Sequence, residues 1–398
     1  MTAGRRLVVA VAVLCALTRS AQARTARKPR ARPNATTTAF PRAVPRAILP
    51  VIAGTDTTVL SRPGPFAVGV RTVAIPGSSA EVWYPVAPGT TGTQASYEMK
   101  MWLPLSAQQR LGTIAGPVFA TTALRDAMPA SAPGGPFPAV IFSHGFGGYR
   151  LQSSFLTIHL ASWGFVVAAP DHPDRNLAAV LGGSFGFASK DVDDLRATVR
   201  ALTELNVSGD LAGRIDLANL TAVGHSAGAN TVLRWASSDE SVRGVVALAG
   251  GAPSLFGAVT TGLQPTLYMS GANDQVISAP SIAAAYAASK APKRLIALAR
   301  SGHLAFADVC SVARDEGGLL AAAAKLGVSV PAALRTLGTD GCDPPNAPVE
   351  QAWPIIELAV TAQLRTVLGA GIPGFGLDQR TLDALSTAGA VKSTFQIG

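Results

Sequence analysis

The sequence predicts an α/β fold in which a mostly parallel central sheet carries helices on both faces. Apolar runs of strand length alternate with runs of helix length over most of the chain. One strand-like run, at 217–223, leads through Gly224-His225-Ser226-Ala227-Gly228 directly into a segment with helical propensity. Alternating strands and helices favour parallel pairing, and a parallel sheet binds ligands at the carboxyl ends of its strands, where Ser226 would lie.

The first 50 residues differ from the rest of the chain in charge and composition. A positively charged start, an apolar run and Ala21-Gln22-Ala23 follow the order of a secretory signal peptide, so residues 1–23 are expected to be cleaved from a secreted or periplasmic protein. Residues 24–52 are basic and are expected to form a disordered arm. The first 50 residues hold ten Lys or Arg and no acid, against a formal net charge of +9 for the whole chain. The charge thus predicts at most weak binding of the arm to an anionic surface, and no nucleic-acid binding by the body.

The catalytic domain is expected to span 53–370, with an insertion at 306–349 and a C-terminal tail at 371–398. Strand-like runs at 68–75 and 81–84, separated by a Pro-Gly turn signal, predict an opening antiparallel pair. Residues 86–137 lack a clear period and are expected to form an excursion over the sheet rather than a second domain.

Three further groups of patterns build the rest of the sheet. Strand patterns at 138–143 and 165–169 flank a helical pattern at 151–163, which predicts a βαβ unit. Apolar positions at helical spacing between 192 and 205 predict the crossover helix that precedes Ser226. After Ser226 the patterns predict strands at 245–249, 266–270 and 293–299, and helices at 279–289 and 352–368.

The stretch around Ser226 has the pattern of a nucleophile elbow, in which a serine is exposed on a strained strand-to-helix turn. Glycines at 224 and 228 are needed there because side chains would collide where strand and helix pack closely. Ser184 lies in a second Gly-x-Ser-x-Gly match, at 182–186, but too few residues separate it from the preceding strand for a parallel strand of its own. We therefore expect Ser226 to be the nucleophile and Ser184 a loop serine.

A serine nucleophile needs a histidine base and a carboxylate that orients it. The order Ser226, Asp274, His303 places both partners in loops just after predicted strands, at the same sheet edge. Four other histidines are assigned to packing or loop roles, and three other acids to surface or capping roles: His144, His159, His172 and His225, and Asp171, Asp174 and Asp308.

The Gly-rich loop 144–148 follows a buried strand and is expected to supply part of an oxyanion hole. The backbone amides of Phe146 and Ala227 are the candidate donors. The alternative is a plain Gly-rich turn. No cofactor and no metal are expected for this chemistry.

Together, the runs 141–148, 160–172 and 224–228 resemble the platelet-activating factor acetylhydrolase-like branch of the α/β-hydrolases. The resemblance extends from about residue 62 to residue 303. It implies an α/β-hydrolase fold, a carboxylic ester hydrolase of short acyl chains, a triad of Ser226, Asp274 and His303, and oxyanion donors at Phe146 and Ala227. Secreted relatives include dienelactone-hydrolase-like enzymes and polyester hydrolases.

We accordingly expect a secreted, monomeric serine esterase that acts on a small-molecule or lipid ester through an acyl-enzyme. A lipase or a cutinase-like polyester hydrolase is the enzymatic alternative, and a non-catalytic binding protein on the same scaffold is the alternative from another class. The acyl length depends on how residues 86–137 and 306–349 cover the site.

Removal of residues 1–23 leaves two cysteines, Cys310 and Cys342. An even pair in an exported chain favours a disulfide. Neither has cysteine or histidine neighbours at metal-site spacing.

Overall fold

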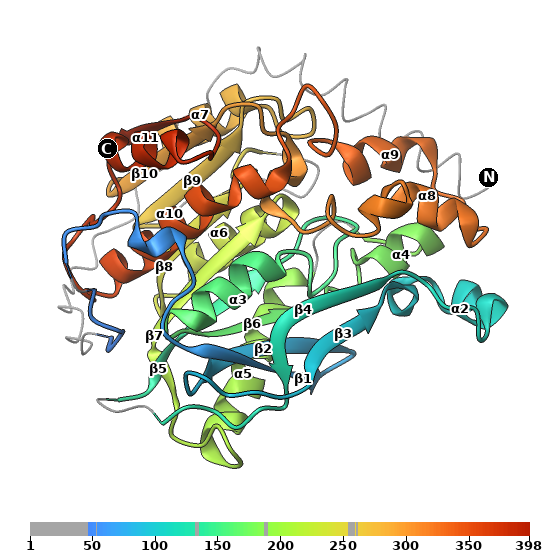
Figure 1. Cartoon of the computed structure of the whole chain (residues 1–398), viewed down its shortest axis with the longest axis horizontal. Coiled ribbons are helices and arrows are strands. Elements are labelled where there is room, and N and C mark those ends of the chain that lie inside the picture. Colours follow the sequence, from blue (N-terminus) through green and yellow to red (C-terminus); the bar gives the residue numbers. More distant parts are fainter. Residues whose placement is uncertain (1–46, 53, 132–134, 187–189, 254–258, 260–261) are drawn as a thin grey trace, which may run out of the picture.

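The protein is described by a computed structural model that covers residues 47–52, 54–131, 135–186, 190–253, 259 and 262–398. The predicted signal peptide and most of the basic arm lie outside these residues. Within them, a single 11-stranded sheet has the order β11-β10-β9-β8-β7-β5-β6-β2-β1-β4-β3. Helices cover both faces of this sheet (Figure 1). No helix in the described part of the chain is both long and apolar enough to span a membrane.

The centre of the sheet is parallel, and it contains the predicted strands. Its members are β5 (Phe137–Ser143), β6 (Val166–Pro170), β7 (Ile215–His225), β8 (Val242–Leu248), β9 (Thr266–Gly271) and β10 (Lys293–Leu298). The predicted opening pair, β1 (Ala67–Ile75) and β2 (Ser78–Val86), is antiparallel. β2 joins the parallel strands through antiparallel pairing with β6. The expectation of a mostly parallel central sheet is confirmed.

Alternate residues of the central strands pack on opposite faces of the sheet, as the period of a strand requires. Val140 and Phe142 contact the layer formed by α3 (Ser154–Ser162) and α10 (Trp353–Val367), whereas Ala139 and Ile141 contact the opposite layer. The opposite layer contains α5 (Asp191–Val207), α6 (Ala227–Ser238) and α7 (Ala279–Ala288). Two apolar cores therefore sandwich the sheet.

Residues 86–137 do not form an excursion over the sheet. They contain β3 (Gln94–Glu98), η2 (Met99–Trp102), α2 (Leu105–Leu111) and β4 (Val118–Arg125), and β4 pairs with β1 and β3 to extend the sheet edge. The sequence signal was weak because edge strands are short and partly exposed, so their apolar alternation is incomplete.

Both ends of the described chain also join the fold. Residues 371–398, expected as a tail, form α11 (Gln379–Thr387) and β11 (Ser393–Ile397), which pairs antiparallel with β10. At the other end Ala47 and Leu49 are buried, and the guanidinium of Arg365 donates to the carbonyl of Pro50 at 2.9 Å. The last residues of the expected arm therefore pack against the end of α10.

The insertion at 306–349 lies at the carboxyl edge of the sheet. It begins within η3 (His303–Phe306) and continues through η4 (Arg314–Glu316), α8 (Gly318–Lys325) and α9 (Ala332–Thr339), ending at η5 (Val349–Gln351). Figure 1 shows α8 and α9 above α4 (Leu177–Gly182), beyond the ends of the central strands. Apolar side chains of α4 and α9 meet in one small cluster.

Candidate active site

Ser226 occupies the turn between β7 and α6 in a strained conformation. Its φ is 57° and its ψ is −120°, and a positive φ is unfavourable for a residue with a side chain. Its amide donates to the carbonyl oxygen of Leu248 on β8 at 2.8 Å, so the neighbouring strand helps to hold the turn. This is the geometry of a nucleophile elbow.

The two glycines of the elbow have no room for a side chain. A Cβ at Gly224 would collide with the backbone of Gly228, and a Cβ at Gly228 would collide with the carbonyl of Ser143 on β5. Three backbone segments, β5, β7 and the start of α6, meet at these positions. The structure therefore contains the close backbone contacts that the two glycines were expected to allow.

Asp274 and His303 lie next to each other at the same edge of the sheet. Asp274 follows β9 and His303 follows β10, and the Nδ1 of His303 lies 2.8 Å from the Oδ2 of Asp274. The other carboxylate oxygen accepts from the backbone amides of Val276 and Ile277 at 2.8 and 2.7 Å. Since an ionised carboxylate can only accept, Nδ1 carries the imidazole proton and Nε2 is left as the basic atom.

The Nε2 of His303 is buried and has no hydrogen-bond partner among the described residues. His303 and Ser226 line the same cavity. The structure therefore places Ser226 and His303 against the same cavity and Asp274 in contact with His303, with no hydrogen bond between the Ser226 hydroxyl and Nε2 of His303.

The Gly-rich loop after β5 runs beside Ser226. A Cβ built on Gly145 would lie 3.3 Å from the Cβ of Ser226, so the loop backbone approaches the serine closely. Phe146 follows Gly145, and both line the cavity. Ala227 is the first residue of α6, where backbone amides have no acceptor within the helix. Ala227 thus directly follows Ser226, and Phe146 follows the glycine that approaches it.

A buried arginine forms hydrogen bonds with the start of this loop. Arg175 donates to the carbonyl of His144 and, at 2.9 Å, to the Oγ of Ser143, and its Nε contacts Asp191 at 2.7 Å. A buried guanidinium is tolerated only with such partners, because an unpaired charge would lose its hydration without compensation.

One group of potential metal ligands occurs within the described part of the chain. The ligand atoms of His172, Asp191 and Asp194 lie within 4.8 Å of one another. These groups already have protein partners, because His172 contacts Asp194 at 2.8 Å and Arg175 contacts Asp191. Arg175 supplies the positive charge that a cation would bring, so the group fits a supporting role next to the Gly-rich loop 144–148.

The other candidates from the sequence lie in different positions. Ser184 is exposed in the loop after α4, and His159 is buried within α3. Asp171 forms an ion pair with the guanidinium of Arg150. Asp308 accepts from the amide of Phe155 near the start of α3. None of these four residues lines the cavity that holds Ser226, within the part of the chain that is described.

The cavity above Ser226 has a volume of about 160 Å³ and is lined mainly by aliphatic side chains. Leu103 comes from the loop after η2, Val180 from α4, and Leu320 and Leu337 from α8 and α9. The insertion therefore forms much of the cavity wall, a point that the sequence left open. An apolar wall next to a buried imidazole suits a substrate group without charge.

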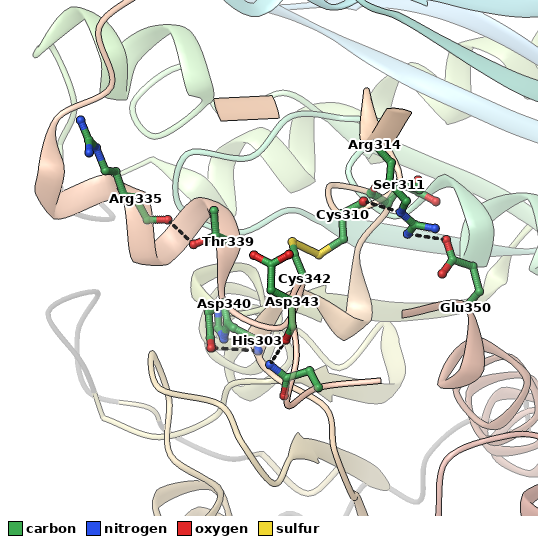
Figure 2. Close-up of a disulfide and its surroundings, with 12 residues drawn as sticks. His303, Cys310, Ser311, Arg314, Arg335, Thr339, Asp340, Cys342, Asp343 and Glu350 are labelled. Carbon is green, nitrogen blue, oxygen red and sulfur yellow. Dashed lines mark hydrogen bonds and ion pairs between the residues drawn. A yellow bond between two sulfur atoms is a disulfide. The ribbon is translucent and has the colours of Figure 1, made fainter. Parts of the chain in front are cut away.

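A disulfide joins Cys310 to Cys342 and closes the segment that carries α8 and α9. Figure 2 shows this bridge near His303, with Asp340 beside the histidine. The disulfide therefore ties both ends of the cavity wall next to the candidate base.

Three residues that contact the site were not foreseen in that role: Gln152, His225 and Asp340. Gln152 contacts His225 across 73 residues, and Asp340 contacts His303 across 37. These contacts join residues that are far apart in the sequence, and no periodicity in the sequence marks them.

The sequence and the structure were compared with known proteins. The family described as platelet-activating factor acetylhydrolase, isoform II, matches residues 72–188, which include the Gly-rich loop 144–148. A platelet-activating factor acetylhydrolase of Cavia porcellus is 28% identical over 153 residues, covering 29% of this chain and 35% of the relative. One of Gallus gallus is 44% identical over 50 residues, covering 13% of this chain and 12% of the relative. The matched part thus spans about a third, or less, of these relatives.

Among solved structures, a ferulic acid esterase from Streptomyces cinnamoneus is similar, with a TM-score of 0.57 and 19% sequence identity. The match covers 79% of this chain and 95% of that one. At this level of identity the likeness concerns the fold, which is the α/β-hydrolase fold that the sequence predicted.

Proposed function

We propose that this chain, an α/β-hydrolase related to the platelet-activating factor acetylhydrolases, is a secreted serine esterase that forms an acyl-enzyme at Ser226. The observation that carries the proposal is the buried pair of Asp274 and His303, because His303 lines the cavity that Ser226 also lines and its Nε2 has no hydrogen-bond partner among the described residues. The similarity to acetylhydrolases supports an ester as the substrate.

In the proposed mechanism the Oγ of Ser226 attacks the ester carbonyl while Nε2 of His303 takes its proton. The negative charge that develops on the carbonyl oxygen is stabilised by the amides of Phe146 and Ala227. Asp274 holds the imidazole with Nδ1 protonated and stabilises the imidazolium that forms. His303 then protonates the leaving alcohol, and water, activated by the same nitrogen, releases the acid.

The cavity wall supports an ester whose acyl or alkyl group is apolar. We favour a short acyl chain, and a lipase or polyester hydrolase remains the alternative. Rates on a series of p-nitrophenyl esters, from acetate to palmitate, together with one aromatic polyester film, separate these activities. A clear preference for acyl chains longer than decanoate would contradict the short-acyl proposal.

Replacement of the nucleophile tests the reaction itself. Ser226→Ala should lower kcat on p-nitrophenyl acetate by about four to six orders of magnitude without changing the fold. Ser184→Ala is the matched control, because it alters the other Gly-x-Ser-x-Gly serine, and it should retain wild-type activity. Hydrolysis retained by a folded Ser226→Ala protein would refute the assignment.

A binding protein on the same scaffold is distinguished by a fluorophosphonate probe. Labelling of the peptide that contains Ser226 supports the enzyme, whereas a folded wild-type protein that takes up no label supports the binding protein. Export is tested separately, by sequencing the N-terminus of the mature protein after expression of the full chain. The proposed cleavage would place Arg24 first.

A further inference from the structure

The two peptide groups of His303 are held by side chains from other parts of the chain. Its amide donates to the Oδ2 of Asp340 at 3.0 Å, and its carbonyl oxygen lies 3.0 Å from the Nε2 of His225. All three residues are buried. His303 opens the short η3, so its amide has no acceptor within that helix. The orientation of its backbone therefore depends on these side chains.

Asp340 connects the candidate base to the candidate acid. The same Oδ2 atom also accepts from the amide of Gln275, the residue after Asp274, at 3.0 Å. The carbonyl of Asp340 accepts from the amide of Leu304 at 2.9 Å. One carboxylate thus bridges the loops after β9 and β10.

The disulfide-closed segment brings Asp340 to this position. Asp340 lies two residues before Cys342, beside His303 (Figure 2). Gly341 has a φ of 101°, and a Cβ on Gly302 would lie 2.6 Å from its Cα, so the two backbones are in direct contact. The insertion is therefore part of the support of the base as well as of the cavity wall.

His225 connects the base to the Gly-rich loop 144–148 through Gln152. The amide of Gly145 donates to the Oε1 of Gln152 at 2.9 Å, and the Nε2 of Gln152 lies 2.6 Å from the Nδ1 of His225. A backbone amide can only donate and a carbonyl can only accept, so the direction of every bond in this chain is fixed. His225 must accept at Nδ1 and carry its proton at Nε2, from which it donates to His303.

His225 is surrounded by groups that oppose a positive charge. Burial, followed by the charges of His303, His144 and Arg175, lowers its pKa well below the usual value, although the backbone hydrogen bond to His303 acts in the opposite sense. A neutral imidazole is what the hydrogen-bond chain requires.

We propose that Asp340 and His225 are positioning residues, which hold the backbone of His303 in a fixed position relative to Asp274 and to the Gly-rich loop 144–148. The proposal rests on the proposed function, in which His303 is the base. Asp340 is not among the described residues that line the cavity, so its loss should change kcat rather than KM. Misplacement of a catalytic group by about 1 Å can cost on the order of 100-fold in rate.

Variants of Asp340 test its proposed role in positioning His303. Asp340→Ala should lower kcat on p-nitrophenyl acetate by about 100-fold at nearly unchanged KM. Asp340→Asn should recover most of that loss, because an amide oxygen accepts the same two N–H groups. Asp343→Ala, at an exposed acid in the same segment, is the control. All are compared at a temperature at which circular dichroism shows each to be folded.

The proposal for Asp340 fails if Asp340→Ala is as active as Asp343→Ala, or if Asp340→Asn is as impaired as Asp340→Ala. An inactive wild-type protein would instead refute the proposed function. The two failures are therefore distinguishable.

The connection from His303 through His225 and Gln152 to the Gly-rich loop is tested without an activity measurement. Imidazole ¹⁵N spectra should show His225 as a neutral Nε2–H tautomer between about pH 5 and 8, a range over which an ordinary histidine titrates. In Gln152→Glu, the new carboxylate should accept from both Gly145 and Nδ1, so His225 should become protonated at a higher pH. Gln109→Glu, at an exposed glutamine, is the control and should leave the spectrum unchanged. An Nδ1–H tautomer, or an ordinary titration in the wild-type protein, would overturn this connection.

Discussion

Ser226 is placed by the local backbone, whereas His303 is placed by contacts from distant parts of the chain. The serine lies at the junction of β7 and α6, where two glycines allow three backbone segments to pack together. The histidine lies in a short turn whose peptide groups are held by His225 and Asp340. A disulfide closes the segment that supplies Asp340. The position of the proposed nucleophile thus depends on sheet packing, and that of the proposed base depends on the insertion.

This difference predicts that the base can be disturbed without loss of the fold. A side chain introduced at Gly224 or Gly228 would disturb packing at the centre of the sheet, so it should reduce activity and stability together. Changes in the insertion should affect the position of His303 first, since the two large cores lie on the faces of the sheet. The following variants test this contrast.

Among these variants the largest effect is expected at the proposed acid, Asp274. Asp274→Asn keeps the shape of the side chain but offers an N–H to His303, which favours the wrong imidazole tautomer. We expect kcat to fall by about 10⁴-fold with little change in melting temperature. Asn273→Ala provides a control in the same loop. Activity of Asp274→Asn close to that of the control would remove Asp274 from the triad.

The next effect concerns the disulfide. Cys310 and Cys342 are 32 residues apart in the sequence. In the chain-entropy model, closing such a loop adds roughly 3 to 4 kcal/mol to the free energy of unfolding, so the double variant Cys310→Ser/Cys342→Ser should melt at a lower temperature. Residual activity after heating should be lost at a lower temperature than the circular dichroism signal. The native protein should also show no free thiol after denaturation. Two titratable thiols, or unchanged thermal inactivation, would contradict the prediction.

A smaller effect depends on pH. Burial raises the pKa of Asp308 to about 8, and burial together with the charge of Asp308 raises that of Glu357 to about 8. Between pH 4 and 8 the native state therefore holds protons that the unfolded chain has released, so stability should fall as pH rises. Asp308→Asn should flatten this slope in urea unfolding, whereas Asp315→Asn, at an exposed site, should not. Equal slopes in all three proteins would contradict the prediction.

The smallest effect is expected for the basic arm. A chain that begins at Ala47 keeps the residues that pack against α10, so it should hydrolyse soluble esters at the wild-type rate. Any binding of the full chain to anionic vesicles should weaken with salt and be lost in the shortened protein. A folded shortened protein without soluble-substrate activity would show that the arm has a catalytic role.

The sequence was most informative where local patterns decide the structure. Apolar alternation located the parallel strands, and the Gly-x-Ser-x-Gly motif located Ser226, because both depend on neighbouring residues. Chain order suggested Asp274 and His303, whose meeting in space depends on the parallel order of β9 and β10. Residues 86–137 were placed over the sheet because the partly exposed β3 and β4 have weak patterns. Asp340 could not be foreseen, since hydrogen bonds between loops that are distant in the sequence leave no periodic signal.

The central claim is that Ser226 becomes acylated during ester hydrolysis. The most direct measurement is mass spectrometry of the wild-type protein, quenched in acid within the first turnovers on p-nitrophenyl acetate, followed by proteolysis. We predict one added acetyl group on the peptide that contains Ser226, which disappears when the substrate is exhausted and is absent from Ser226→Ala. Hydrolysis at the wild-type rate with acetyl found on another residue, or with none on any peptide while a fluorophosphonate leaves Ser226 unlabelled, would contradict the claim.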